Sequence, residues 1–242
     1  IFTPSPRADA QWGWELAKLV VQVADGNWPE LVAHLAHTHL VIEAFAVATH
    51  RHLAEVHPIW ALLVPHYEGT LFINEAAATS LIAADGPIDH IFAGTIHSTQ
   101  GLAVAARLDF DFTAKMLPHD LAARGVGPGS ALADFPYRDD GLRVWEAIRS
   151  WAQAYVGLYY ASDADVLADT ELAAWADCIA GEAAIKGFGP IDSLTALVDA
   201  CLQLEPQRRP DGHHHDEDRG PNHDARGATT SEPPARERVP CW

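Results

Sequence analysis

The sequence contains little positive charge. Its 16 lysines and arginines face 33 aspartates and glutamates, and the formal net charge is -17 at pH 7. Lysine is confined to Lys18, Lys115 and Lys186. Because nucleic-acid binding depends on a basic surface that neutralises phosphates, no nucleic-acid partner is expected. An anionic membrane would repel such a chain overall, so contact with lipid is expected to be peripheral.

Cysteine and long apolar runs are also scarce. Cys178, Cys201 and Cys241 are an odd number without a C-x-x-C pair, which excludes a disulfide framework and a thiolate zinc site. No transmembrane segment is predicted, because no apolar run reaches the length that spans a bilayer. Ile1 is not an initiator methionine, so the chain looks cut at its start and the compartment stays open, with a slight preference for the cytoplasm.

What the sequence does contain is helical periodicity. Apolar residues at spacings of three and four predict a helix from Trp14 that closes at Gly26, and a second from Trp28 to about Leu53. Residues 88–110 read as one largely buried helix. Further along, the stripe Leu142, Trp145, Ile148, Trp151 and Tyr155 predicts a core-facing helix. No stretch alternates convincingly like a strand, so the predicted fold class is all-α.

The composition changes abruptly after Leu204. From Glu205 onward, prolines and charged residues replace large apolar side chains, and such a segment cannot bury a core. The predicted organisation is one helical domain over residues 1–204 and a disordered tail over residues 205–242.

The stretch "HLAHTH" places His34, His37 and His39 within an apolar helix. On a regular α-helix, residues five apart point roughly 140° away from each other, so His34 and His39 could not share an ion. A π-turn would bring them onto one face, whereas His34 and His37 would meet on an ordinary helix. Spacing alone predicts a metal-binding helix, with zinc, copper, iron and nickel open.

The longer run over residues 34–82, "HLAHTHLVIEAFAVATHRHLAEVHPIWALLVPHYEGTLFINEAAATSLI", resembles the lipoxygenase family. The resemblance continues through "LPHDLAARGV", "DFPYRDDGLRVWEAIRSWAQAYVGLYY" and "IDSLTALVDAC". It implies the helical catalytic domain, of a compact bacterial type. His34 and His39 fall on the first two ligands of the family's mononuclear non-haem iron, in a helix of π form, which makes His37 a neighbour of the site. His57 and His66 fall on family histidines expected to make structural hydrogen bonds.

The chemistry that the resemblance implies is removal of a bis-allylic hydrogen from a polyunsaturated fatty acid of the linoleate type, followed by addition of dioxygen to give a hydroperoxide. Leu81 and Ile88 fall on apolar positions that hold the reactive carbon, and Phe92 on a position along the fatty-acid channel. Ala77 falls on a position whose small side chain is associated with S products.

The chain departs from the family beyond residue 201. The third iron histidine, the asparagine position after it and the C-terminal isoleucine carboxylate are not visible. The family's spacing places that histidine near residues 212–214, where "HHH" stands, but Pro206 and Pro210 would interrupt the required helix. We therefore expect a truncated lipoxygenase with a frameshifted, non-native tail, exposed apolar surface, and weak or no activity. The alternatives are a non-catalytic helical lipid-binding fragment and adventitious metal binding by residues 213–218.

Overall fold

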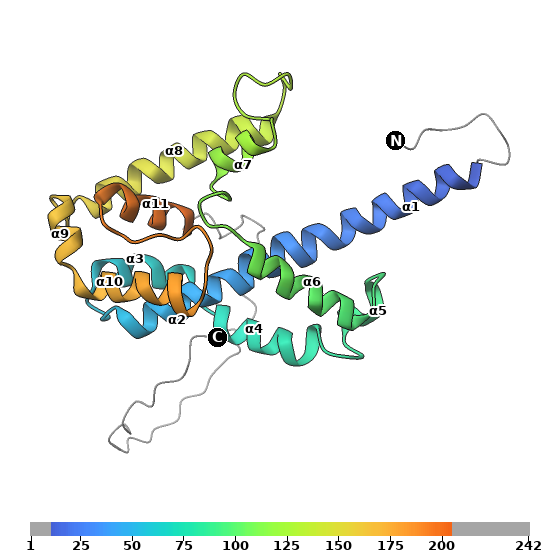
Figure 1. Ribbon diagram of the computed structural model, residues 1–242, viewed down its shortest axis with the longest axis horizontal. Helices are drawn as coiled ribbons and strands as arrows, with labels where there is room; N and C mark the ends of the chain where they lie inside the picture. Colours follow the sequence, from blue (N-terminus) through green and yellow to red (C-terminus); the bar gives the residue numbers. More distant parts are fainter. Residues whose placement is uncertain (1–10, 205–242) are drawn as a thin grey trace, which may run out of the picture.

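A computed structural model describes residues 11–204 of the chain (Figure 1). The described part is built from helices, as the all-α prediction requires, and within it the sole β-type pairing is an isolated bridge between Asp111 and Lys186. The predicted boundary at Leu204 and the tail over residues 205–242 lie at and beyond the limit of the described residues.

One continuous helix organises the fold. It runs as α1 (Gln11–Asn27), then as the π-helix η2 (Trp28–Leu40), then as α2 (Val41–His52). The predicted stop at Gly26 is therefore wrong: Gly26 does not have the positive φ of a helix-ending glycine, and Asn27 is in the right-handed helical region. As Figure 1 shows, α1 extends away from the other helices.

Because the helix does not end at Gly26, the apolar helix is longer than the sequence predicted. The helix Trp12–His52 is long and apolar enough to cross a membrane by length and composition alone. A share of 44% of its most apolar window is buried inside the fold, and the core helix of a soluble protein meets the same criterion. This helix is therefore weak evidence for a membrane span.

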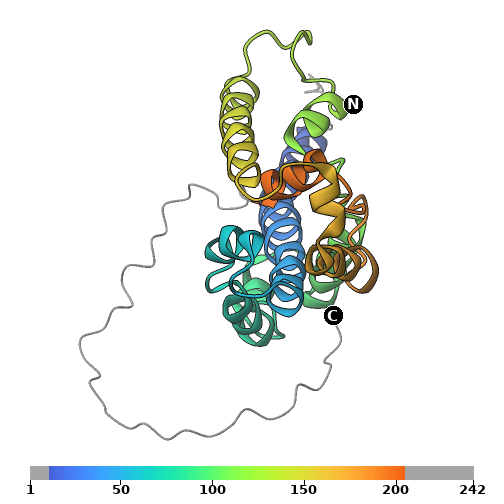
Figure 2. The same ribbon diagram turned by 90° about the vertical axis from the view of Figure 1, so that its left-hand side faces the viewer.

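The core lies around α2, which carries Phe45 fully buried. Phe45, Phe112 and Phe188 pack mutually with ring centroids 5.1–5.4 Å apart. Trp175, on α10 (Thr170–Asp177), closes the cluster with its ring centroid 5.6 Å from that of Phe188. Aromatic pairs of this kind add to the apolar area that they bury. The helix α2, and with it the end of η2, lies between α3 (Pro58–Leu63) and α4 (Thr70–Ala76) on one side and α10 on the other (Figure 2).

The segment after α2 folds back beside η2 in short pieces. Residues 88–110 do not form the single buried helix that was predicted. They divide between α5 and α6, because Phe92 is extended and the Thr95 side chain accepts from Ser98 N and caps a new helix. The pieces are α3 (Pro58–Leu63), η3 (Val64–His66), α4 (Thr70–Ala76), η4 (Ala77–Leu81), α5 (Pro87–Ile91) and α6 (Ile96–Asp109).

The C-terminal half packs α8 (Pro136–Val156) against α11 (Leu194–Leu204). Within the predicted stripe, Trp145 is buried and Tyr155 packs against the core, but Trp151, which stacks on Tyr155, is 51% exposed. That part of the core prediction is wrong. The remaining helices are α7 (Leu117–Ala123), α9 (Asp163–Ala168) and η5 (Cys178–Glu182).

Candidate metal centre and apolar pocket

The π winding of η2 decides which histidines share a face. It brings His34 and His39, five residues apart, side by side with ring centroids 4.8 Å apart. The opposite face of η2 packs tightly on α6, where the small residues Ala36 and Ala106 are buried together with Val32. The Thr38 side chain donates a hydrogen bond from Oγ1 to the backbone oxygen of Ala33, five residues earlier on the π-helix, at 3.0 Å. The π conformation that a pairing of His34 with His39 requires is therefore present.

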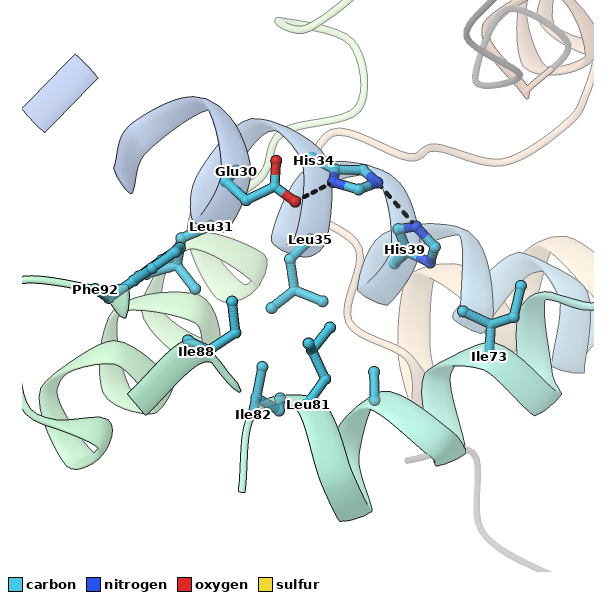
Figure 3. Close-up of a pocket in the computed structure, with 11 residues that line it drawn as sticks. Glu30, Leu31, His34, Leu35, His39, Ile73, Leu81, Ile82, Ile88 and Phe92 are labelled. Carbon is cyan, nitrogen blue, oxygen red and sulfur yellow. Dashed lines mark hydrogen bonds and ion pairs between the residues drawn. The ribbon is translucent and has the colours of Figure 1, made fainter. Parts of the chain in front are cut away.

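The two imidazoles face each other through their Nε2 atoms. These nitrogens are 3.1 Å apart, and the ring planes are inclined by 68° (Figure 3). The outer nitrogens have separate partners: Nδ1 of His34 lies 2.9 Å from Oε1 of Glu30, and Nδ1 of His39 lies 2.9 Å from Oδ1 of Asn74. Because the Glu30 carboxylate accepts, Nδ1 of His34 carries the proton and its Nε2 has a free lone pair.

The geometry of the two Nε2 atoms is suitable for two of the ligands of a metal ion. Two bonds of about 2.1 Å from imidazole nitrogens, meeting at a right angle, put those nitrogens about 3.0 Å apart. A metal-bound histidine commonly donates its other N–H to a carboxylate or an amide oxygen, as both of these do. Among residues 11–204, no cluster of three or more histidine, cysteine, aspartate or glutamate side chains could hold an ion. The described residues therefore supply two ligands and leave the coordination sphere incomplete.

The neighbouring histidines have other roles. His37 lies against Phe110 with ring centroids 5.3 Å apart, and burial, reinforced by the charge of Lys115, lowers its pKa. His57 accepts from Ile59 N through Nδ1 and donates from Nε2 to Asp169, at 3.0 Å. The structural role expected for His57 is confirmed. The pairing of His34 with His37 that an ordinary helix would produce is absent.

An apolar pocket of about 160 Å³ opens beside the pair. All four residues predicted to contact substrate, Ala77, Leu81, Ile88 and Phe92, line it together with His34 and His39. η2 supplies one wall, α4 and η4 a second, and α5 with Phe92 a third. Figure 3 shows the apolar side chains gathered below the two rings. The other lining residues are Glu30, Leu31, Leu35, Ile73 and Ile82.

A tight turn sets the width of this pocket. Between η4 and α5 the chain passes Gly86, where an added Cβ would clash with the carbonyl oxygen of Ser80. The turn brings Leu81 and Ile88 into opposing walls. The pocket is open: the His34 side chain is 40% exposed, and large apolar side chains around it reach solvent, as predicted from the sequence. Two of the residues that line the pocket, Ile73 and Leu81, are each 41% exposed.

Sequence reasoning missed two polar residues of the site. Glu30 had a detectable signal, because it stands one helical turn before His34. Asn74 had none: it is 35 residues from His39 in sequence and reaches it only through the tertiary contact of α4 with η2.

The family is decided by a match over most of the chain. The sequence model described as Lipoxygenase matches residues 1–185. The chain belongs to the lipoxygenase family. One lipoxygenase relative, a linoleate 9/13-lipoxygenase of Pseudomonas aeruginosa, is 55% identical over 197 residues, which cover 81% of this chain and 29% of that protein. A seed linoleate 9S-lipoxygenase of Glycine max is 43% identical over 187 residues, or 74% of this chain and 21% of that one.

Solved lipoxygenase structures agree. A coral 8R-lipoxygenase superposes with a TM-score of 0.74 at 31% sequence identity, over 83% of this chain and 31% of that one. The helical fold is thus that of part of a lipoxygenase catalytic domain. The chain spans less than a third of the length of each of these relatives.

Proposed function

We propose that this chain is part of a fatty-acid dioxygenase, with residues 1–204 forming a portion of the catalytic domain. The substrates would be a polyunsaturated fatty acid of the linoleate type and dioxygen. The observation that carries the proposal is the facing pair of Nε2 atoms, 3.1 Å apart at the end of an apolar pocket. The relatives named as linoleate lipoxygenases support the choice of substrate.

His34 and His39 would hold a mononuclear non-haem iron, because imidazole is a suitable ligand for iron and a pair of histidines recurs, together with a carboxylate, in many non-haem iron sites. When bound, the iron supplies the one-electron redox chemistry by which a fatty acid becomes reactive toward dioxygen. Glu30 and Asn74 keep the Nδ1 protons outward, so that both Nε2 lone pairs remain available to it.

The pocket side chains would bind and orient the hydrocarbon. Each buried methylene contributes about 0.8 kcal/mol, so an apolar channel holds a fatty acid without polar contacts along its chain. An apolar cavity of roughly 150 Å³ accommodates a benzene-sized ligand. The pocket of about 160 Å³ therefore takes a segment of the substrate, between Leu81 and Ile88 and toward Phe92. Ala77, with its small side chain, leaves space for dioxygen on one side.

Metal content tests the proposal. We expect near-stoichiometric iron in the 242-residue chain, measured by elemental mass spectrometry, and its loss in His34→Ala. A variant with alanine at His213, His214 and His215 is the control for metal held by that cluster, which lies outside the described residues. Iron that persists in His34→Ala, or that disappears only with the three substitutions, would contradict the proposal.

A second function has its own support. Because the described residues supply only two ligands, a non-catalytic fragment that binds fatty acid in the open pocket is the alternative. Oxygen consumption with linoleate separates the two, since linoleate binding without oxygen uptake by iron-loaded protein would favour the binding fragment.

A further inference from the structure

Asn74 is a buried polar residue that contacts His39, one of the two histidines lining the apolar pocket. It lies on α4, with 6% of its surface exposed, and uses its whole side-chain amide. Nδ2 donates to the backbone oxygen of His39 at 3.1 Å and to Oε2 of Glu43 at 2.7 Å, while Oδ1 lies 2.9 Å from Nδ1 of His39. Within the described residues, Asn74 alone links α4 to both η2 and α2 through side-chain hydrogen bonds.

The direction of these hydrogen bonds is forced. A carbonyl oxygen and a carboxylate only accept, so the NH2 group of Asn74 must face His39 O and Glu43. The amide oxygen is thereby left toward Nδ1 of His39, and an amide oxygen also only accepts. Nδ1 of His39 therefore carries the proton, and its Nε2 has a free lone pair.

Without this constraint the other tautomer would be favoured. A proton on Nε2 of His39 could be donated to the lone pair on Nε2 of His34, 3.1 Å away, and would make a hydrogen bond within the pair. That hydrogen bond would occupy both nitrogens that face the pocket. Asn74 works against it by holding the proton on the far side of the ring.

We propose that Asn74 is a positioning residue that fixes the tautomer and orientation of His39, with Glu43 locking the amide of Asn74 in turn. The inference deepens the proposed function and rests on it for its consequence, the binding of iron. The tautomer itself is a property of the metal-free chain. The two therefore have separate tests.

The direct test is 15N nuclear magnetic resonance of the histidine side chains of the metal-free, full-length protein. The His39 signals are identified by their absence from His39→Gln. We expect the Nδ1–H form in the native sequence and a change toward the Nε2–H form in Asn74→Leu, which has a similar volume and no hydrogen-bonding group. Glu75→Gln, an exposed change at the next residue, is the matched control and should leave the spectrum unchanged.

Two further variants keep the test decisive if Asn74→Leu fails to fold. Asn74→Asp combined with Glu43→Gln, which can turn an NH2 group toward the new carboxylate, retains an accepting oxygen opposite Nδ1 and should keep the Nδ1–H form. Glu43→Gln removes the acceptor-only partner of Nδ2 and should populate the Nε2–H form in part. An unchanged Nδ1–H form in both Asn74→Leu and Glu43→Gln, or an Nε2–H form in the native sequence, would overturn the proposal.

The consequence for binding is measured by anaerobic titration with Fe(II). Loss of a residue that orients a metal-bound histidine typically weakens metal affinity by about 10–100-fold, and we expect that loss in Asn74→Leu but not in Glu75→Gln. If His34→Ala binds iron as well as the native chain while the tautomer still changes with Asn74, the proposed function fails and the positioning role stands. A native affinity in Asn74→Leu whose tautomer has changed would overturn the role in metal binding.

Discussion

Two histidine-bearing regions of this molecule use the same side chain in opposite ways. In the buried joint between α3 and α10, His57 satisfies both ring nitrogens with protein partners: Nδ1 accepts from Ile59 N and Nε2 donates to Asp169. On η2, His34 and His39 each hydrogen-bond a protein side chain through Nδ1, and their Nε2 atoms face each other. A histidine that serves the fold closes its hydrogen bonds, whereas a candidate ligand keeps one lone pair free.

The largest effect on stability is expected at the first region. His57→Ala removes the cap of α3, worth about 1 kcal/mol, and a hydrogen bond to a charged carboxylate, worth about 1.5–3 kcal/mol. We expect the free energy of unfolding in urea to fall by about 2–4 kcal/mol. His97→Ala, at an exposed histidine, should change it by less than about 0.5 kcal/mol. Equal effects at the two positions would break the comparison.

The partner of His57 adds a pH dependence. Burial alone would raise the pKa of Asp169, but hydrogen bonds from Leu172 N, Tyr160 and His57 outweigh it and hold that pKa below its ordinary value. The charged form therefore stabilises the fold at pH values above 3.8, the ordinary pKa of this group. This contribution is lost as the pH falls through the lowered pKa of folded Asp169.

Asp169→Asn should lower the free energy of unfolding by about 1–2 kcal/mol at neutral pH, since it replaces hydrogen bonds to a charged group with weaker ones. The difference from the native chain should narrow as the pH falls below 3.8. Urea unfolding from pH 7 to pH 3 measures it. A difference that stays constant over this range would show that the charge of Asp169 does not contribute.

The smallest effect is expected at the second region. In metal-free protein, with a chelator present, His34→Leu should change the free energy of unfolding by less than about 0.5 kcal/mol, because the side chain is 40% exposed and contributes no core contact. The same variant should bind no iron. A loss of stability comparable to that of His57→Ala would mean that the pair serves the fold, and the distinction between the two regions would disappear.

Much of the fold could be predicted from the sequence because local periodicity determines it. The helical class follows from apolar spacing, and so does a helix that carries the histidines and ends near Leu53. That helix does end, as α2, at His52. The exceptions arose at helix ends, where apolar periodicity does not reveal whether a helix continues or is capped and restarted. Gly26 has helical geometry because α1 and η2 continue as one helix, and the break after Ile91 depends on Thr95, whose capping role periodicity does not reveal.

The site divides in the same way. Spacing left the pairs His34–His37 and His34–His39 open, and the resemblance selected the second pair with its π winding. The four apolar positions taken from the resemblance all line the pocket. Asn74 could not be found, since its contact with His39 is created only when α4 folds back on η2. The exposure of Trp151 was not predicted for a related reason. An apolar stripe on a helix does not reveal which part of it packs against another element.

The π-helix η2 constrains how this protein can change over evolution. It is wound into a single rod between α1 and α2, and α2 is anchored by Phe45 in the aromatic core. Deleting one residue from η2 would change the rotation of everything beyond it about the helix axis, so either the core or the site would be misaligned. Insertions and deletions in this rod are therefore expected to be eliminated by selection for folding, even in descendants that no longer need the histidines.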